Sequence, residues 1–371
     1  VESRGLGDVY KRQIVDASDS DKVQIVLDGV HINCKTNAAI YVREADKVFI
    51  TLAENSSNTL GGGNEYTQID DNTVDGVIFS KSNLVCNGTG SLTIEADYKH
   101  GIVSKDDLVI TGGTYKIAAA DNGITAKDQI KILNGSFDID AANSAVKAKN
   151  TDDAELGNIY IAGGIFTIEA EQDGFHATGS IVVDDGTITV NSGDDGFHAE
   201  LDTVIHGGTI LVEKSNEGLE GKRVVVNGGD ITVNASDDGA NAAGSGDDDS
   251  NAASSNNDSS AAVNSGDDSS ISGAADGKEP PQMPPDTENG SDMQPSQDFD
   301  PENAPSGGNA PQNFDPGNAP SDGDAPQKMQ GGPGGGGNSE LYIKITGGTL
   351  TVSADGDGLD SNLSLIHISE P

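Results

Sequence analysis

The sequence is poor in the residues that build large globular cores or disulfide frameworks. It contains no tryptophan, 4% aromatic residues and two cysteines, Cys34 and Cys86. A narrow aliphatic core is therefore expected, and the cysteines fit either one disulfide or two buried thiols. No apolar run approaches 18 residues, so the sequence predicts no membrane-spanning helix.

Positive charge is also scarce. The 371-residue chain has 21 basic and 61 acidic residues, which gives a net charge of -40. Binding to nucleic acid requires a basic surface, so nucleic acid is excluded as a natural partner. An acidic composition of this kind is typical of proteins that bind cations.

What the sequence does contain is a repeat. A diglycine-type turn returns about every 22 residues, with glycine at its second position at Gly113, Gly135, Gly164, Gly186, Gly208 and Gly229, and again at Gly348. The first position is Asn134 or Asp185 in two of the turns and glycine in the others. Short runs that alternate apolar and polar residues flank each turn, and their β-branched residues predict strands. A further glycine opens all but one of these repeats, as at Gly101 and Gly174, and Ala145 takes that place once. Repeats of this length predict a solenoid.

Three short strands in each repeat fit one coil of a parallel β-helix, so the predicted fold class is all-β. Like strands recur in register, and each can therefore lie about 4.8 Å from its own copy. Two ladders are predicted to point inward. One runs through Ile102, Ile124, Val146, Phe175, Phe197, Leu219 and Leu359, and the other through Tyr115, Phe137, Phe166, Ile188, Ile210, Ile231 and Leu350. The aromatic members are predicted to form a core stack rather than a platform for sugars.

A segment of different composition interrupts the repeat. Residues 246–339 hold twelve of the 13 prolines, 17 acidic residues and two lysines. Such a segment cannot bury enough apolar surface to fold, so a disordered acidic insertion is predicted between β-helix at 14–245 and a further coil at 340–362. Residues 1–13 and 363–371 break the repeat and resemble translated sequencing-adapter sequence, so they are excluded from the fold prediction.

Acidic residues gather just before the opening glycine of successive coils. If the coils are in register, neighbouring carboxylates lie about 4.8 Å apart and repel by roughly 3–4 kcal/mol at an effective dielectric near ~20. A divalent cation would relieve this, and calcium suits carboxylates and carbonyl oxygens at turns. The candidate calcium ligands are Asp173, Asp194, Asp195, Glu217, Glu220, Asp237 and Asp238. The alternative is ordinary Asp-Gly turn chemistry.

Much of the scarce positive charge falls two or four residues after the opening glycine, where side chains are predicted to face outward. The candidate ligand-binding residues are Lys105, Lys127, Lys147, Lys149, His176, His198 and Lys222, with Tyr160 on the next strand able to stack on a sugar ring. This face is predicted to bind an anionic polymer such as a uronic-acid polysaccharide. The alternative is that the lysines offset neighbouring acids. The repeated histidines fit either a transition-metal site or a polar ladder.

Several segments together resemble one family. They include Ser-Lys-Asp-Asp-Leu-Val-Ile-Thr-Gly-Gly-Thr at 104–114, Asp-Asn-Gly-Ile-Thr-Ala-Lys-Asp at 121–128 and Asp-Gly-Leu-Asp-Ser-Asn at 357–362. Over 14–245 and 340–362 the chain resembles the bacterial "carbohydrate-binding domain-containing" proteins, long a domain of unknown function. The resemblance implies a pectate-lyase-like right-handed parallel β-helix that binds plant cell-wall polysaccharide, both cellulose and acidic sugars such as polygalacturonate. It also implies calcium ions in the coils and export, either as a secreted or as a cell-surface protein.

Three functions follow from these patterns. The favoured interpretation is non-catalytic binding of polysaccharide by a monomer, with no catalytic residue. A calcium-dependent pectate-type lyase is the second, and it needs a base near the metal, for which Lys222 and Arg223 form the one plausible basic pair. The third is a structural surface adhesin without a defined sugar ligand.

Overall fold

The structure, a computed structural model, describes residues 12–243, 341–361 and 365–368, all of which form strands and turns. The predicted insertion at 246–339 and most of the segment at 1–13 lie outside the described residues. Within the described ranges there is no helix that is long and apolar enough to cross a membrane.

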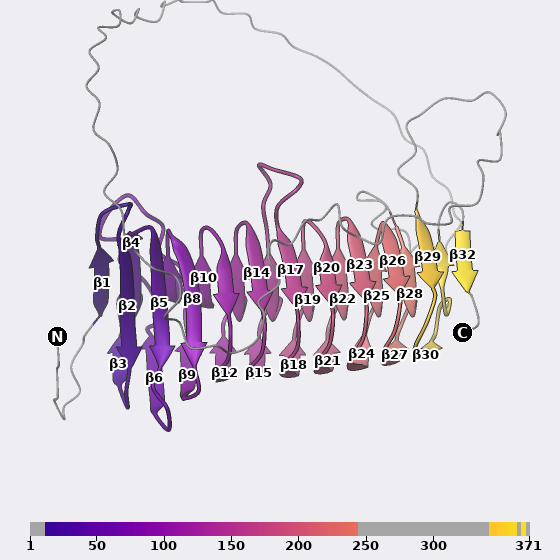
Figure 1. Cartoon of the computed structure of the whole chain (residues 1–371), viewed down its shortest axis with the longest axis horizontal. Helices are drawn as coiled ribbons and strands as arrows, with labels where there is room; N and C mark the ends of the chain where they lie inside the picture. Colours follow the sequence, from indigo (N-terminus) through magenta and orange to yellow (C-terminus); the bar gives the residue numbers. More distant parts are fainter. Residues whose placement is uncertain (1–11, 244–340, 362–364, 369–371) are drawn as a thin grey trace, which may run out of the picture. The chain divides into compact units, whose positions relative to one another are not determined.

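The strands form three parallel sheets, which stack coil on coil as a right-handed β-helix (Figure 1). Sheet I has eleven strands, in the order β1 (Gln13–Asp16), β4 (Ile40–Glu44), β7 (Gly76–Ser80), β10 (His100–Ser104), β13 (Ile124–Ala126), β16 (Val146–Ala148), β19 (Phe175–Ala177), β22 (Phe197–Ala199), β25 (Leu219–Gly221), β28 (Ala240–Ala242) and β31 (Asp360–Ser361).

Sheet II also has eleven strands, in the order β2 (Lys22–Leu27), β5 (Lys47–Leu52), β8 (Asn83–Gly88), β11 (Leu108–Ile110), β14 (Gln129–Ile132), β17 (Asn158–Ile161), β20 (Ile181–Val183), β23 (Asp202–Ile205), β26 (Arg223–Val226), β29 (Tyr342–Ile345) and β32 (Leu365–Ile368). Sheet III has ten strands, in the order β3 (His31–Cys34), β6 (Ser57–Gly62), β9 (Ser91–Ala96), β12 (Thr114–Ala119), β15 (Ser136–Ala141), β18 (Ile165–Ala170), β21 (Thr187–Ser192), β24 (Thr209–Ser215), β27 (Asp230–Ala235) and β30 (Thr349–Ala354). Each strand pairs with the strand three places further along the chain, which confirms the predicted three-strand coil.

The stack continues on the far side of the long interruption. β29 pairs in parallel register with β26, so that Tyr342 lies beside Arg223. β32 in turn pairs with β29, with Leu365 beside Tyr342. Residues 365–368 therefore extend sheet II, where the sequence analysis predicted a break in the repeat. Gln13, placed before the predicted β-helix, begins β1 and pairs with Ile40.

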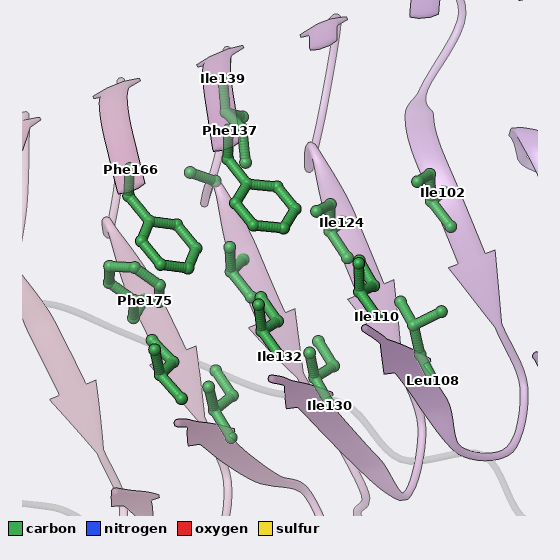
Figure 2. Packing of buried hydrophobic residues seen from close by; sticks show 14 of the residues in the cluster. Ile102, Leu108, Ile110, Ile124, Ile130, Ile132, Phe137, Ile139, Phe166 and Phe175 are labelled. Carbon is green, nitrogen blue, oxygen red and sulfur yellow. The ribbon is translucent and has the colours of Figure 1, made fainter. Parts of the chain in front are cut away.

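The core follows the two predicted ladders. Tyr115, Phe137 and Phe166 are buried and stack face to face, with ring centroids 5.1 and 4.7 Å apart. Phe166 also meets Phe175 edge-on at 5.8 Å, and the aliphatic side chains of the neighbouring strands fill the rest of the interior (Figure 2). The prediction of a core stack is confirmed. In the last coil Leu350 and Leu359 are partly buried against the same core.

The two cysteines are free thiols. Both are buried, Cys34 on β3 of sheet III and Cys86 on β8 of sheet II. Burial raises the pKa of Cys86 to about 12 because the apolar interior disfavours the thiolate. Of the two alternatives left open by the sequence, the structure has the pair of buried thiols.

The diglycine turns require glycine at their second position. Gly208 has a φ of +95°, and a Cβ there would lie 2.7 Å from the carbonyl oxygen of Gly186 in the preceding coil. We expect Gly208→Ala to lower the free energy of unfolding by roughly 1–3 kcal/mol, because it adds backbone strain to a clash with backbone. Urea unfolding followed by circular dichroism measures the change.

Gly358→Ala is the matched control for this prediction. A Cβ at Gly358 meets nothing within 4 Å. Its unfolding free energy should change by less than about 0.5 kcal/mol, as for other unstrained surface substitutions. Equal losses in the two variants would contradict the steric account of the turn.

Candidate functional site

Sheet I carries a row of polar side chains along its outer face. In β16, β19, β22 and β25 the first and third residues are buried and the middle one is half-buried at the surface. The middle residues lie beside one another in register, in the order Lys147, His176, His198, Glu220 and then Asn241 of β28. We call this the outer row. The structure thus brings three of the predicted ligand-binding residues into one line, at about 4.8 Å per coil.

A second row stands one position before the opening glycine of each coil. Here side-chain oxygens accept hydrogen bonds from the backbone N–H of the equivalent residue in the next coil. Asp173 Oδ1 accepts from Asp195 N at 3.4 Å, and Asp195 Oδ1 accepts from Glu217 N at 3.2 Å. Asn122 Oδ1 does the same for Ser144 N at 3.2 Å. These side chains therefore hold successive coils together, a role that the sequence analysis did not assign.

The second oxygen of two of these aspartates meets a histidine of the outer row. Asp173 Oδ2 lies 2.7 Å from His176 Nδ1, and Asp195 Oδ2 lies 3.0 Å from His198 Nδ1. The two imidazole rings stack on each other, with centroids 4.7 Å apart and planes 9° from parallel. Ser144 Oγ donates a further hydrogen bond to Asp173 Oδ2 at 3.0 Å. The repeated Asp-Gly-Phe-His motif thus forms an Asp–His pair in each of two coils. The sequence analysis did not predict this pairing, although the motif was a signal for it.

Carboxylates from three coils converge beside His198. Glu220 Oε2 contacts His198 Nδ1, while both carboxylate oxygens of Glu217 accept hydrogen bonds from Asn241 Nδ2 at 3.0 Å. Potential ligand atoms of Asp173, Asp195 and His198 lie within 4.8 Å of one another, and so do those of Asp195, Glu217 and Glu220. We call Asp173, Asp195, His198, Glu217 and Glu220 the coil cluster.

The other three candidate calcium ligands are not among the residues whose ligand atoms lie within 4.8 Å of one another. Asp194 and Asp237 belong to a row one residue earlier, where the backbone of Asn216 bonds to both and separates them. Asp238 Oδ1 accepts a hydrogen bond from Asp357 N at 2.6 Å. Of the seven predicted metal ligands, the structure therefore gathers Asp173, Asp195, Glu217 and Glu220, and it adds His198.

Burial and mutual repulsion change the proton affinity of the coil cluster. Burial raises the pKa of Glu217 to about 8, and the neighbouring charges of Asp195 and Glu220 act in the same direction. Burial and nearby carboxylates also raise the pKa of Asp195. Burial alone would lower the pKa of His198, but its hydrogen bonds to Asp195 and Glu220 outweigh that effect and raise it to about 11. The cluster therefore holds protons that a cation would displace.

The predicted lysines fall into two groups. Lys105 pairs with Asp75 at 3.3 Å and Lys127 pairs with Asp152 at 2.8 Å, so these two offset neighbouring acids. Lys147, Lys149 and Lys222 form no salt bridge with any residue that the structure describes. Lys147 is half-buried, and burial lowers its pKa although Asp173 opposes the shift. The unpaired lysines are the ones available to an anionic ligand.

Tyr160 and Arg223 lie on sheet II rather than sheet I. The hydroxyl of Tyr160, on β17, donates to Asp184, which also lies 2.7 Å from His206 Nδ1. The guanidinium of Arg223, on β26, makes two contacts with the carboxylate of Asp202. The structure therefore does not bring Tyr160 into the outer row, and the guanidinium of Arg223 is engaged by an acid.

Comparisons with known proteins agree with this fold. A family model described as "Carbohydrate-binding domain-containing protein" matches residues 7–276. A relative with the same description from Acetivibrio thermocellus is 35% identical over 108 residues, which cover 29% of this chain and 38% of the relative. A solved structure described as the polysaccharide lyase-like protein from C. thermocellum, gadolinium derivative, has a TM-score of 0.51 and 31% identity. The alignment covers 52% of this chain and 79% of that one.

Proposed function

The chain belongs to the carbohydrate-binding domain-containing protein family, and we propose that it binds acidic plant cell-wall polysaccharide without cleaving it. The proposed ligands are polyuronates such as polygalacturonate, with cellulose as a second one, and the proposed setting is the outside of a bacterial cell. The match to the relative covers 38% of that protein. The polyuronate is inferred from the residues of this chain, whereas cellulose is what the family resemblance implies.

The outer row of sheet I is the observation that carries the proposal. Lys147 lies in this row beside two stacked histidines, on a chain of net charge -40. Lys149 and Lys222 directly follow β16 and β25 of the same sheet. An extended polyuronate presents a carboxylate on every sugar, so it can lie along sheet I and meet Lys147, Lys149 and Lys222 on different coils. Charge-assisted hydrogen bonds from lysine to carboxylate are among the stronger polar contacts in proteins.

Calcium is the proposed cofactor, and the donor set of the coil cluster fits it in part. Three carboxylates, from Asp195, Glu217 and Glu220, lie within mutual reach, as a hard oxygen-seeking cation requires. The solved relative is a gadolinium derivative, and gadolinium is likewise a hard cation that prefers oxygen. A bound calcium ion would neutralise the carboxylates next to the outer row and supply a positive charge to an anionic sugar.

The alternative function is a polysaccharide lyase, because the solved relative is described as polysaccharide lyase-like. That reaction needs a free base to remove a proton next to the uronate carboxyl group. In this chain Arg223 is bound to Asp202, and the neighbouring Lys222 is the remaining member of the predicted basic pair. The predicted basic pair is thus reduced to one member, and a lyase would depend on Lys222 alone as its base.

Reversing the charge of two lysines tests the binding face. We expect the double variant Lys147→Glu and Lys149→Glu to bind polygalacturonate at least tenfold more weakly, which corresponds to about 1.4 kcal/mol. The reason is that two attractive contacts with the polyuronate become repulsive. Isothermal titration calorimetry at about 0.15 M ionic strength, with calcium present, measures the change.

A variant of equal charge on another face is the control. Lys116 on β12 and Lys214 on β24 are exposed on sheet III. The double variant Lys116→Glu and Lys214→Glu should keep its affinity within about threefold. It removes the exposed ion pair of Lys116 with Asp138 on sheet III, but on the glycan it acts through the overall charge alone, which salt screens. An equal loss of polygalacturonate affinity in both double variants would contradict the binding face. It would mean that the glycan binds elsewhere or that net charge alone causes the loss.

A further inference from the structure

The imidazole of His198 meets more acceptors than it can satisfy. Its Nδ1 lies 3.0 Å from Asp195 Oδ2 and also contacts Glu220 Oε2. An imidazole nitrogen carries at most one proton, so it cannot donate a full hydrogen bond to both carboxylates. A metal ion held by the nitrogen and by both carboxylates would satisfy all three groups at once.

The protein holds these ligands in place. Asp195 and Asp173 are each 6% exposed. Glu217 N donates to Asp195 Oδ1 at 3.2 Å, and Asp195 N donates to Asp173 Oδ1 at 3.4 Å. Backbone hydrogen bonds thus fix one oxygen of each aspartate and leave the other one facing the histidines. Partners of this kind orient metal ligands and strengthen their affinity.

Asn241 supplies a second, independent observation. This side chain is 8% exposed and reaches into the coil cluster, where its Nδ2 donates to Glu217. Its Oδ1 is buried and accepts no hydrogen bond from the part of the chain that the structure describes. Buried amide oxygens are normally paired. The unpaired oxygen belongs to the same amide that binds the Glu217 carboxylate, so it adds one more acceptor next to the coil cluster, which a cation or its bound water would complete.

The type of donor decides which cation fits best. Calcium takes oxygen ligands, whereas imidazole suits zinc and its neighbours among the first-row metals. We propose that His198, Asp195 and Glu220, with Asp173 and Glu217 alongside, bind a first-row divalent ion such as Zn²⁺ more tightly than Ca²⁺. This inference rests on the cation pocket of the proposed function and is independent of glycan binding.

His176 provides a matched comparison within the same chain. It occupies the equivalent position one coil earlier and has a single carboxylate neighbour, Asp173, at its Nδ1. In the outer row His176 lies between Lys147 and His198, so neither neighbour is a carboxylate. His198 lies between His176 and the carboxylate of Glu220. The pocket should therefore depend on His198 and not on His176.

Metal titration of the full chain without glycan tests the inference. We expect calorimetry to show at least tenfold tighter binding of Zn²⁺ than of Ca²⁺. His198→Asn should weaken the binding of Zn²⁺ at least tenfold and change the affinity for Ca²⁺ by less than about threefold. Removing a group that only orients a metal ligand typically lowers metal affinity by about 10–100-fold, and removing the ligand itself should cost at least as much. His176→Asn should leave Zn²⁺ affinity within about threefold.

Nuclear magnetic resonance of the unmodified chain gives a second readout that does not depend on the folding of a variant. The imidazole ¹⁵N signals of His198 should shift on addition of Zn²⁺, and those of His176 should shift less. Unchanged Zn²⁺ affinity in His198→Asn, or equal loss in His176→Asn, would overturn the inference. Binding of Ca²⁺ that matches or exceeds Zn²⁺ would overturn it and leave the proposed calcium site standing, while failure of both ions would overturn both cation proposals.

Discussion

Replacing Phe166 by alanine is expected to lower the free energy of unfolding by about 3–5 kcal/mol, the largest loss from any single substitution considered for this chain. Phe166 is 1% exposed and lies between two aromatic neighbours, stacked on Phe137 at 4.7 Å and edge-on to Phe175 at 5.8 Å. The narrow core offers few mobile side chains to fill the cavity. Urea unfolding followed by circular dichroism measures the loss.

Thr167→Ala is the control for this substitution. Thr167 is the next residue on β18 and points outward. Its replacement should change the unfolding free energy by less than about 0.5 kcal/mol. A loss below about 1 kcal/mol for Phe166→Ala would mean that the aromatic ladder does not carry the stability of the central coils.

The second large effect is a loss of stability with rising pH in the cation-free protein. The folded chain keeps a proton on Glu217 up to about pH 8, whereas the unfolded chain releases it near about pH 4.3. His198 stays protonated up to about pH 11 in the folded chain, compared with about 6.5 when unfolded. In both cases the folded state binds more protons, so stability is highest at low pH and falls as pH rises.

Between pH 5 and pH 9 we expect a fall of at least about 4 kcal/mol in unfolding free energy, which is what Glu217 alone contributes between pH 5 and pH 8, measured by urea titration in the presence of a chelator. Glu217→Gln should reduce the slope because the amide does not titrate. Saturating calcium should remove most of the fall, since the ion takes the place of the protons. A flat profile without cations would show that the carboxylates of the coil cluster are not destabilised when charged.

The architecture of the chain was predictable because it depends on local pattern. The spacing of the glycines and the period-two runs identified the coil, the inward position of Phe137 and Phe166 and the outward position of Lys147. The same pattern predicted a break at residues 363–371. The structure continues β32 there, because four alternating residues, Leu365–Ile368, are enough to pair with β29.

The site was predictable in position but not in its contacts. The sequence showed that acidic residues gather before the opening glycine. It did not show that Asp173 and Asp195 accept hydrogen bonds from the next coil, because those bonds depend on how the coils stack. The pairing of Lys127 with Asp152 depends on a longer turn in the following coil. Tyr160 was placed with the lysines because it follows them on the next strand, and the turn between β16 and β17 carries it to sheet II. Contacts of this kind form between coils, so they cannot be predicted from the spacing of residues within one coil.

One measurement tests the central claim most directly: calcium-dependent binding to polygalacturonate, with the ultraviolet absorbance of unsaturated product followed in the same sample. The account predicts saturable binding that chelation abolishes, with no rise in absorbance. A steady rise in absorbance would make the protein a lyase and turn attention to Lys222. Absence of binding with calcium present would contradict the assignment of the outer row to acidic polysaccharide.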